Sequence, residues 1–242
     1  MKPPSRARLA EMWAPAQPVA VRAHELANEQ GSRAVSVPHL AATLLELESI
    51  LEVTERCGAD AELAHYVALA TIDELPRRRW WQGRPTEDRV LNHIYSGALG
   101  HAVAAELPAV SAELLLVRML AHDPSAPIVE RLDALGLEVL LVRRVVAHGT
   151  TEEPPLEDGF GAGRVRVMND PFTTFELVVE VFETCFGFSA DRAERLMRRV
   201  HERGAATFQI DEWERARRAV LEARRMSQSR GYPLRLRLER RA

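Results

Sequence analysis

The sequence predicts two folded parts, an all-helical domain with pseudo-twofold symmetry and then a small α/β domain of order β-α-α-β-α-β. Three observations indicate this class. Apolar residues recur with a helical period from residue 18 to residue 148, and one type of helix start appears twice. Residues 149–163 are rich in Gly, Pro and acids. From residue 164 onward, short runs with strand-like alternation lie between helical segments.

Composition places the chain among ordinary globular proteins. It has 242 residues, of which 46% are hydrophobic and 28% charged. No apolar run approaches the roughly 20 residues that span a bilayer, so we expect no membrane association. The first residues are basic but lack an apolar core, so no secretory signal is expected. Cys57 and Cys185 are too few and too far apart for a disulfide framework or a metal site. A cytoplasmic protein without metal or cofactor is the expectation.

The net charge of −3 conceals an asymmetry between the two parts. Residues 164–242 hold 17 Arg against 12 acidic residues, and residues 1–163 hold 15 basic against 23 acidic ones. Such halves could attract each other or different partners, or could simply be solvated surfaces. The Arg-rich stretch 215–225 is interpreted as a solvated helix face, with no nucleic acid as partner. Lys2 is the only lysine, which excludes a P-loop.

The first 148 residues divide into a tail and a helical domain. Residues 1–17 contain three prolines and are predicted to form a flexible tail. In the domain, 18–148, Ser36 followed by Pro38 marks a helix start, and Gly58 marks a helix end. Residues 77–88 form a polar break, after which helices resume.

The helical domain repeats itself. Ser111 begins a second Leu-rich helix of the type that Ser36 begins, and Gly136 corresponds to Gly58. The period of about 75 residues, with only two copies, excludes a solenoid and favours one domain of two similar halves.

A resemblance follows from these motifs. Two four-helix repeats, the Ser-Val-Pro-His-Leu helix start and the closing VVAHGTTEEPP resemble the N-terminal domain of Clp ATPases such as ClpA, over about residues 18–155. The resemblance implies a docking platform with no catalysis of its own.

Residues 149–163, GTTEEPPLEDGFGAG, are predicted to be a flexible linker that spans about 20 Å. Its GxGxG pattern lacks a lysine and a preceding strand, so a nucleotide site is not expected there.

The α/β domain, 164–242, begins with a short strand that ends at a polar elbow, Asn169-Asp170. A helix follows, for which Thr173 and Glu176 fit a capping box. Ser189 begins a second helix, and Gly204 ends it. A strand, AATFQI, then precedes a long helix opened by Asp211 and Glu214 and a last strand, LRLRLE, that starts after Pro233.

One group of residues in this domain is a candidate binding site. Met197, Val200 and His201 share a helix face because they are three and four residues apart. If that face meets the elbow, the two form a pocket whose walls are Phe175, Val178, Met197 and Val200, with Asn169, Asp170, Thr173 and His201 at its rim.

A protein N-terminus suits such a pocket. The α-amino group is mostly cationic at neutral pH and offers three donors to amide, carboxylate and imidazole acceptors. Burial of a Leu or Phe side chain contributes about 1.5–3 kcal/mol, so micromolar binding is expected after association costs.

The pattern MNDPFTTFELV…LMRRVHERGAA…YPLRLRLE is similar to ClpS, the adaptor that hands N-degron substrates to Clp proteases. The resemblance covers essentially all of residues 164–242. It implies that Asn169 and His201, with Asp170, bind the substrate's α-amino group. It also implies a hydrophobic pocket lined by Thr173, Phe175, Val178, Met197, Val200 and Leu234.

This chain departs from that family at two positions. Pro171 replaces an Asp that often helps to hold the amine, and Phe175 stands where a Met usually gates the pocket. Both changes should weaken or retune binding. The family surface that docks on ClpA falls near residues 211–219, where Glu214 matches the expected acid and Arg217 does not.

The sequence therefore predicts a non-enzymatic adaptor or modulator of a Clp ATPase-protease, with N-degron proteins and a ClpA-like ATPase as partners. The alternative is a decoy or inhibitory protein with a weak pocket, whose acidic N-domain docks its own basic adaptor domain. A hydrolase that uses His201 is disfavoured because no nucleophile is paired with it. Taken alone, His201 could simply be a histidine near a helix C-terminus, where a cation is favourable.

Overall fold

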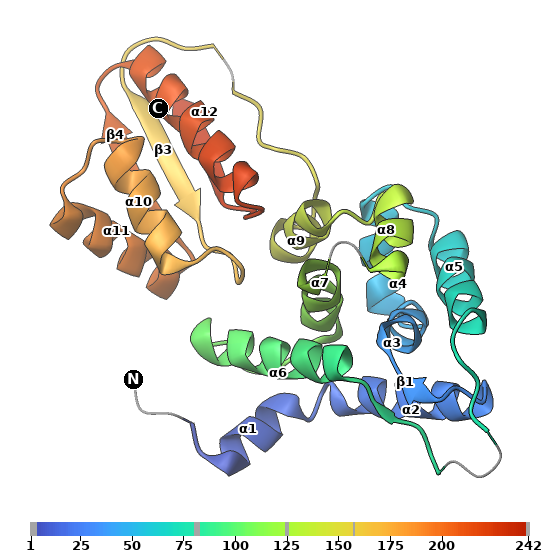
Figure 1. Cartoon of the computed structure of the whole chain (residues 1–242). Coiled ribbons are helices and arrows are strands. Elements are labelled where there is room, and N and C mark those ends of the chain that lie inside the picture. Colours follow the sequence, from blue (N-terminus) through green and yellow to red (C-terminus); the bar gives the residue numbers. More distant parts are fainter. Residues whose placement is uncertain (1–3, 80–82, 124–125, 157, 241–242) are drawn as a thin grey trace. The chain divides into compact units, whose positions relative to one another are not determined.

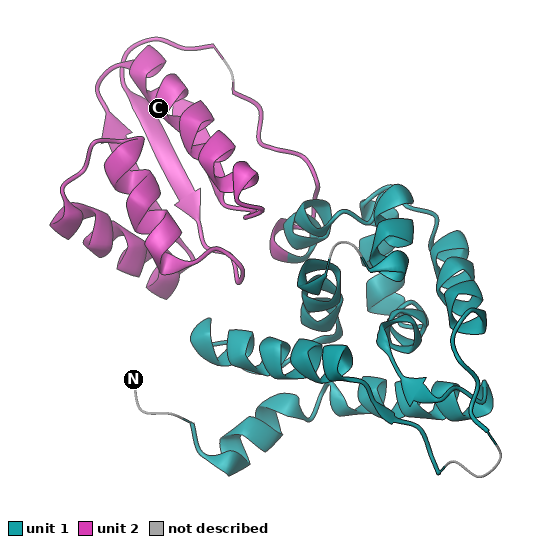
Figure 2. Cartoon of the chain, viewed as in Figure 1, with its two compact units in different colours: residues 1–146 teal, residues 147–242 magenta. Residues whose placement is uncertain are grey.

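The computed structural model describes residues 4–79, 83–123, 126–156 and 158–240. Their chain forms two compact units, residues 1–146 and residues 147–242 (Figures 1 and 2). The first unit is helical, and the second combines helices with a three-stranded sheet, so the predicted fold class is confirmed.

Helices and one short pair of strands build the first unit. The strands β1 (Ala34–Val35) and β2 (Thr86–Glu87) pair in parallel. The helices are α1 (Arg6–Trp13), α2 (Gln17–Glu29), α3 (Val37–Leu44), α4 (Glu48–Arg56), α5 (Ala61–Asp73), α6 (Arg89–Ala104), α7 (Ala112–His122), α8 (Pro127–Ala134) and α9 (Val139–His148).

Helices α2–α5 and α6–α9 repeat one plan. Ser36 and Ser111 are the N-caps of α3 and α7, and the side chain of Ser111 accepts a hydrogen bond from the backbone N–H of Leu114 at 3.2 Å. Gly58 and Gly136 follow α4 and α8 with positive φ angles of 83° and 97°, a conformation that glycine adopts without strain. The predicted pseudo-twofold organisation is therefore present in the fold.

Two segments of this unit differ from expectation. Residues 6–13 form a helix, because Met12 is buried and Trp13 packs edge-on against Tyr95, with the ring centroids 5.2 Å apart. The carbonyl of Met12 also accepts a hydrogen bond from Val110 N at 2.8 Å. Within the polar break, Thr86–Glu87 pair with Ala34–Val35, so the break contains a strand.

The second unit has the predicted order β-α-α-β-α-β. Its elements are β3 (Gly163–Met168), α10 (Phe175–Thr184), α11 (Ala190–Arg203), β4 (Ala205–Ile210), α12 (Trp213–Ser229) and β5 (Arg235–Arg240). The strands form an antiparallel sheet in the order β4-β3-β5, in which Met168 at the end of β3 lies opposite Ala205 and Arg235.

Side chains alternate across this sheet. Val165 and Val167 of β3 and Leu236 and Leu238 of β5 point into the core, where they pack with apolar side chains of α10, α11 and α12. Phe182 is fully buried among them. The core fixes the directions of α10 and α11, and these two helices pack against each other.

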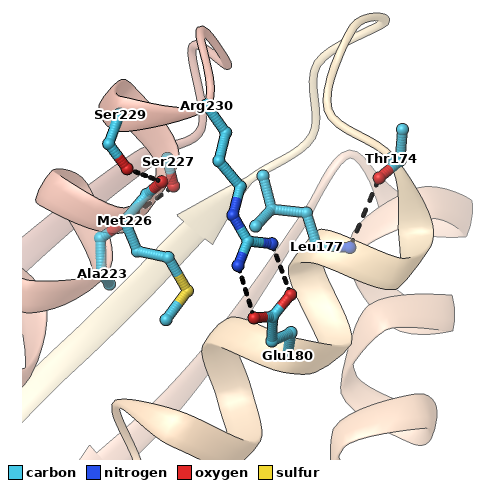
Figure 3. Close-up of polar contacts among 8 residues, drawn as sticks. All are labelled: Thr174, Leu177, Glu180, Ala223, Met226, Ser227, Ser229 and Arg230. Carbon is cyan, nitrogen blue, oxygen red and sulfur yellow. Dashed lines mark hydrogen bonds and ion pairs between the residues drawn. The ribbon is translucent and has the colours of Figure 1, made fainter.

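The start of α10 corrects one prediction. The N-cap is Thr174, whose hydroxyl accepts a hydrogen bond from Leu177 N at 3.4 Å (Figure 3). Thr173 lies one residue before the cap, and its hydroxyl donates to Asp170 Oδ2 at 2.7 Å. The expected Thr173–Glu176 capping box is therefore wrong. The N-cap of α12 is Glu212, next to the expected Asp211.

The segment between the helical domain and β3 lies against α12. Glu153 Oε1 accepts a hydrogen bond from Gln228 Nε2 at 3.0 Å, and Glu153 Oε2 lies 3.4 Å from Nε of the buried Arg224. Gly159 sits directly on the indole ring of Trp213. The segment was expected to be a free linker, but these contacts hold it to the second unit.

Candidate functional site

The elbow after β3 is held by Asp170. Its Oδ1 accepts hydrogen bonds from Phe172 N at 2.9 Å and Thr173 N at 2.7 Å, and its Oδ2 accepts the Thr173 hydroxyl. Only 8% of Asp170 is exposed. This Asx-type turn is the local interaction that Asp favours, and it ends β3 and aims the chain into α10. The backbone N–H of Asn169 donates to Gly204 O at 2.9 Å, which ties the elbow to the end of α11.

A second contact fixes α10. The guanidinium of Arg230, the C-cap residue of α12, forms a bidentate ion pair with Glu180, with N–O distances of 2.5 and 2.6 Å (Figure 3). This hydrogen-bonded ion pair lowers the pKa of Glu180. It joins α10, which carries Val178, to the turn before β5, which leads to Leu234.

The structure brings together all nine residues predicted to bind the substrate. They line one pocket between the N-terminal end of α10 and the C-terminal end of α11, with Leu234 coming from the approach to β5. The predicted residues in its lining are Asn169, Asp170, Thr173, Phe175, Val178, Met197, Val200, His201 and Leu234.

Met168 also lines the pocket, and the sequence reasoning did not include it. Strand alternation places it on the side opposite to Val167, away from the core. The signal that could have found it is its position directly before Asn169.

The pocket has an apolar interior and a polar rim. Val178, Val200 and Leu234 are buried and form an apolar interior, whereas Asn169 is exposed and His201 is half-buried. The site therefore offers an amide and an imidazole at its rim and apolar surface below. Pro171, next to these groups, has neither a carboxylate nor a backbone N–H.

Phe175 covers the pocket. Its ring lies edge-on to the imidazole of His201, with ring centroids 4.8 Å apart and planes at 71°, and 37% of the residue is exposed. The remaining cavity has a volume of about 10 Å³, close to the space for one water molecule. A benzene-sized group needs a cavity of about 150 Å³, so a large side chain enters only if Phe175 or Met197 moves.

Several features outside the pocket also bear on function. Glu214, the expected partner-binding residue, is exposed in the first turn of α12 and does not line the pocket. Burial raises the pKa of both Cys57 and Cys185 to about 11, so these thiols are protonated at neutral pH. Across the ranges that the structure describes, His, Cys, Asp and Glu form no cluster suited to a metal ion, and no helix could cross a membrane.

Comparisons with known proteins agree with this two-part organisation. Residues 163–237 match the model of the ATP-dependent Clp protease adaptor protein ClpS, and residues 12–132 match the Clp repeat (R) N-terminal domain. The second match spans half of the chain.

Individual relatives match the second unit. The ClpS adapter of Nitratidesulfovibrio vulgaris is 37% identical over 76 residues, which are 31% of this chain and 76% of the relative. The ClpS adapter of an Enterobacter species is 34% identical over 77 residues, which cover 32% of this chain and 73% of the relative.

Among solved structures, the N-domain of ClpV from Vibrio cholerae aligns with a TM-score of 0.45 at 15% identity, covering 56% of this chain and 86% of that one. The Hsp104 N-terminal domain from Candida albicans aligns with a TM-score of 0.46 at 13% identity, covering 53% and 88%. The assignment rests on the sequence matches, which show that this chain belongs to the ClpS adaptor family through its C-terminal unit and carries a Clp N-terminal repeat domain before it.

Proposed function

We propose that this protein is a non-enzymatic adaptor or modulator that presents substrate proteins to a Clp ATPase-protease and recognises them by a bulky hydrophobic N-terminal residue. The observation that carries the proposal is the pocket itself, because nine side chains from the elbow, α10, α11 and the approach to β5 converge on one site. The membership of the C-terminal unit in the ClpS family supports it.

The rim fits an α-amino group. The amide oxygen of Asn169 and a ring nitrogen of His201 accept hydrogen bonds from the amine, each worth about 1.5–3 kcal/mol with a charged donor. Asp170 also shapes the rim. Three hydrogen bonds from the elbow occupy its carboxylate, so its main task is to position Asn169, and its negative charge adds attraction for the cation.

The first side chain of the substrate enters the apolar interior. It displaces the ring of Phe175 and packs on Val178, Val200 and Leu234, and its burial contributes about 1.5–3 kcal/mol. Loss of the carboxylate at Pro171 and the need to move Phe175 both reduce affinity. The expected dissociation constants therefore lie in the micromolar range.

A direct test uses fluorescent peptides that begin with Leu, Phe, Tyr or Trp and the full-length protein. Fluorescence anisotropy is expected to show micromolar binding of at least one of them. His201→Ala should weaken that binding at least about tenfold, since one hydrogen bond to the charged amine is lost. Arg195→Ala is the matched control, because Arg195 lies on the exposed side of the same helix and outside the pocket. If none of the four peptides binds at high micromolar concentration, the recognition proposal fails.

A second candidate is an inhibitory role with a weak or silent pocket. The small volume under Phe175 and the presence of Pro171 favour it. In that case the protein lowers Clp-dependent degradation of a ClpS substrate when it is added to a reconstituted protease, while the four peptides do not bind. Stimulated degradation of a substrate with N-terminal Leu or Phe would exclude this candidate.

A further inference from the structure

The outer face of the sheet in the second unit is basic. Arg166 of β3 and Arg237 of β5 are exposed and lie directly opposite each other in the strand register. Arg235 lies two residues along β5, and Arg203 ends α11. Their inward neighbours Val167 and Leu236 are buried, so alternation projects the arginines away from the core.

These arginines line a second hollow, distinct from the pocket under Phe175. It has a volume of about 430 Å³, and its lining includes Arg166, Arg203, Arg235 and Arg237. Met168 and Asn169 line both the hollow and the pocket. A polypeptide whose amine is held at Asn169 can therefore continue past Met168 into the hollow, since each extended residue advances the chain by about 3.3–3.6 Å.

Three arginines of the hollow, Arg166, Arg203 and Arg237, carry charge that no acidic side chain among the described residues pairs with. Like charges directly opposite each other on neighbouring strands are destabilising. Two residues along the strands, Arg164 lies opposite Glu239, with an N–O distance of 3.9 Å, so the same two strands do pair opposite charges there. Among the residues that the structure describes, Arg166, Arg203 and Arg237 have no ion-pair partner, and no Asp or Glu lines the hollow.

The lining favours an acidic peptide over a nucleic acid. Single-stranded nucleic acids bind on aromatic side chains that stack with bases, and the described residues that line the hollow include no Phe, Tyr or Trp. Carboxylates, in contrast, match guanidinium groups in charge and geometry.

We propose that the basic hollow binds acidic side chains at the second to fourth positions of the substrate whose N-terminal residue occupies the pocket. This inference rests on the proposed function, and it names the substrate class as polypeptides with a bulky hydrophobic first residue followed by Asp or Glu. The pocket recognises the first residue, and the arginines recognise the negative charge of the residues that follow it.

The test compares three fluorescent peptides that begin Leu-Glu-Glu, Leu-Gln-Gln and Leu-Arg-Arg and are otherwise identical, with the full-length protein. At about 50 mM NaCl, Leu-Glu-Glu is expected to bind about three- to tenfold more tightly than Leu-Gln-Gln, and Leu-Arg-Arg more weakly than either. At about 300 mM NaCl the difference should shrink because salt screens exposed charges.

Variants then locate the effect. Arg166→Gln combined with Arg237→Gln should remove the advantage of Leu-Glu-Glu and leave Leu-Gln-Gln binding unchanged. Arg225→Gln, an exposed arginine of α12 outside the hollow, should leave the advantage intact.

Each outcome separates the two proposals. Equal affinities for Leu-Glu-Glu and Leu-Gln-Gln would overturn the acidic-segment inference and leave recognition of the first residue standing. Failure of every Leu peptide would overturn the proposed function and this inference with it. Displacement of bound Leu-Glu-Glu by a single-stranded oligonucleotide at equal or lower concentration would identify the hollow as a nucleic-acid site instead.

Discussion

Phe175 closes the proposed N-terminus pocket, so Phe175→Ala tests whether this residue acts as a gate. In the closed state the phenyl ring covers a cavity of about 10 Å³ and contacts His201 edge-on at a centroid distance of 4.8 Å. A ligand must break this ring contact before its side chain can enter. Truncation to Ala removes the cover without touching the elbow, because no hydrogen bond of Asp170 involves Phe175.

The expected change in the association rate constant follows from the energy of the ring contact. Edge-on aromatic pairs contribute about 0.5–1.5 kcal/mol beyond the area they bury. A closed state favoured by that amount reduces the fraction of open pocket by roughly two- to twelvefold. Phe175→Ala should therefore raise the association rate constant for a Leu peptide by about that factor. The dissociation rate should also rise, because the ring no longer covers the bound side chain.

Stopped-flow fluorescence with a peptide labelled at its C-terminus measures both rates. Phe160→Ala is the matched control, since Phe160 is 91% exposed and outside the pocket, and its substitution should change neither rate. An association rate for Phe175→Ala that equals the wild-type rate or falls below it would refute the gate. In that case Phe175 is only a wall of the pocket.

Three further predictions concern stability and positioning. Burial lowers the pKa of His39 from 6.5 to about 4, so the neutral ring stabilises the fold above pH 6.5 and this contribution is lost as the pH falls towards 4. The loss reaches about 2 kcal/mol near pH 5. In urea titrations at several pH values, His39→Gln should reduce the dependence of the unfolding free energy on pH, and an unchanged dependence would contradict this role of His39. Asp170→Ala should lower unfolding free energy by about 1–3 kcal/mol and abolish Leu-peptide binding, whereas retained binding by calorimetry would show that the elbow does not depend on this carboxylate. Gly159→Ala makes a Cβ overlap the Trp213 ring and should destabilise the second unit by about 1–3 kcal/mol, whereas Gly100→Ala in open space on α6 should stabilise the first by about 0.5–1 kcal/mol; equal thermal shifts would be inconsistent with the packing.

Local sequence patterns predicted most of the site. Met197, Val200 and His201 could be placed on one face because helical periodicity alone fixes it, and α11 is regular from Ala190 to Arg203. The elbow was also readable, because Asn and Asp after a strand are typical of turns. The meeting of these two pieces, and the inclusion of Leu234, followed from the resemblance to a known family.

Two details of the site could not be predicted from the sequence. Thr174 caps the helix, whereas the hydroxyl of Thr173 donates to Asp170 in the elbow. The closure of the pocket depends on the contact between Phe175 and His201, which sequence spacing does not specify. That contact joins α10 to α11, so its geometry is set only when the two helices pack.

Segments with weak local signals were also misread. Residues 149–163 resemble a flexible linker in composition, but the contacts of Glu153 with Arg224 and Gln228 and the fit of Gly159 on Trp213 show that they lie on α12. Residues 6–13 resemble a tail because prolines surround them, although buried Met12 holds the helix in place. Composition describes average behaviour, and a few specific contacts are sufficient to override it.

The most direct test of the central claim compares two peptides that differ only at the N-terminus. Isothermal titration calorimetry of the full-length protein with a peptide that begins with free Leu is expected to give a micromolar dissociation constant. The same peptide with an acetylated N-terminus should show no binding, because the charged donors for Asn169 and His201 are gone. Equal affinity for the two peptides would contradict recognition of the α-amino group at this pocket.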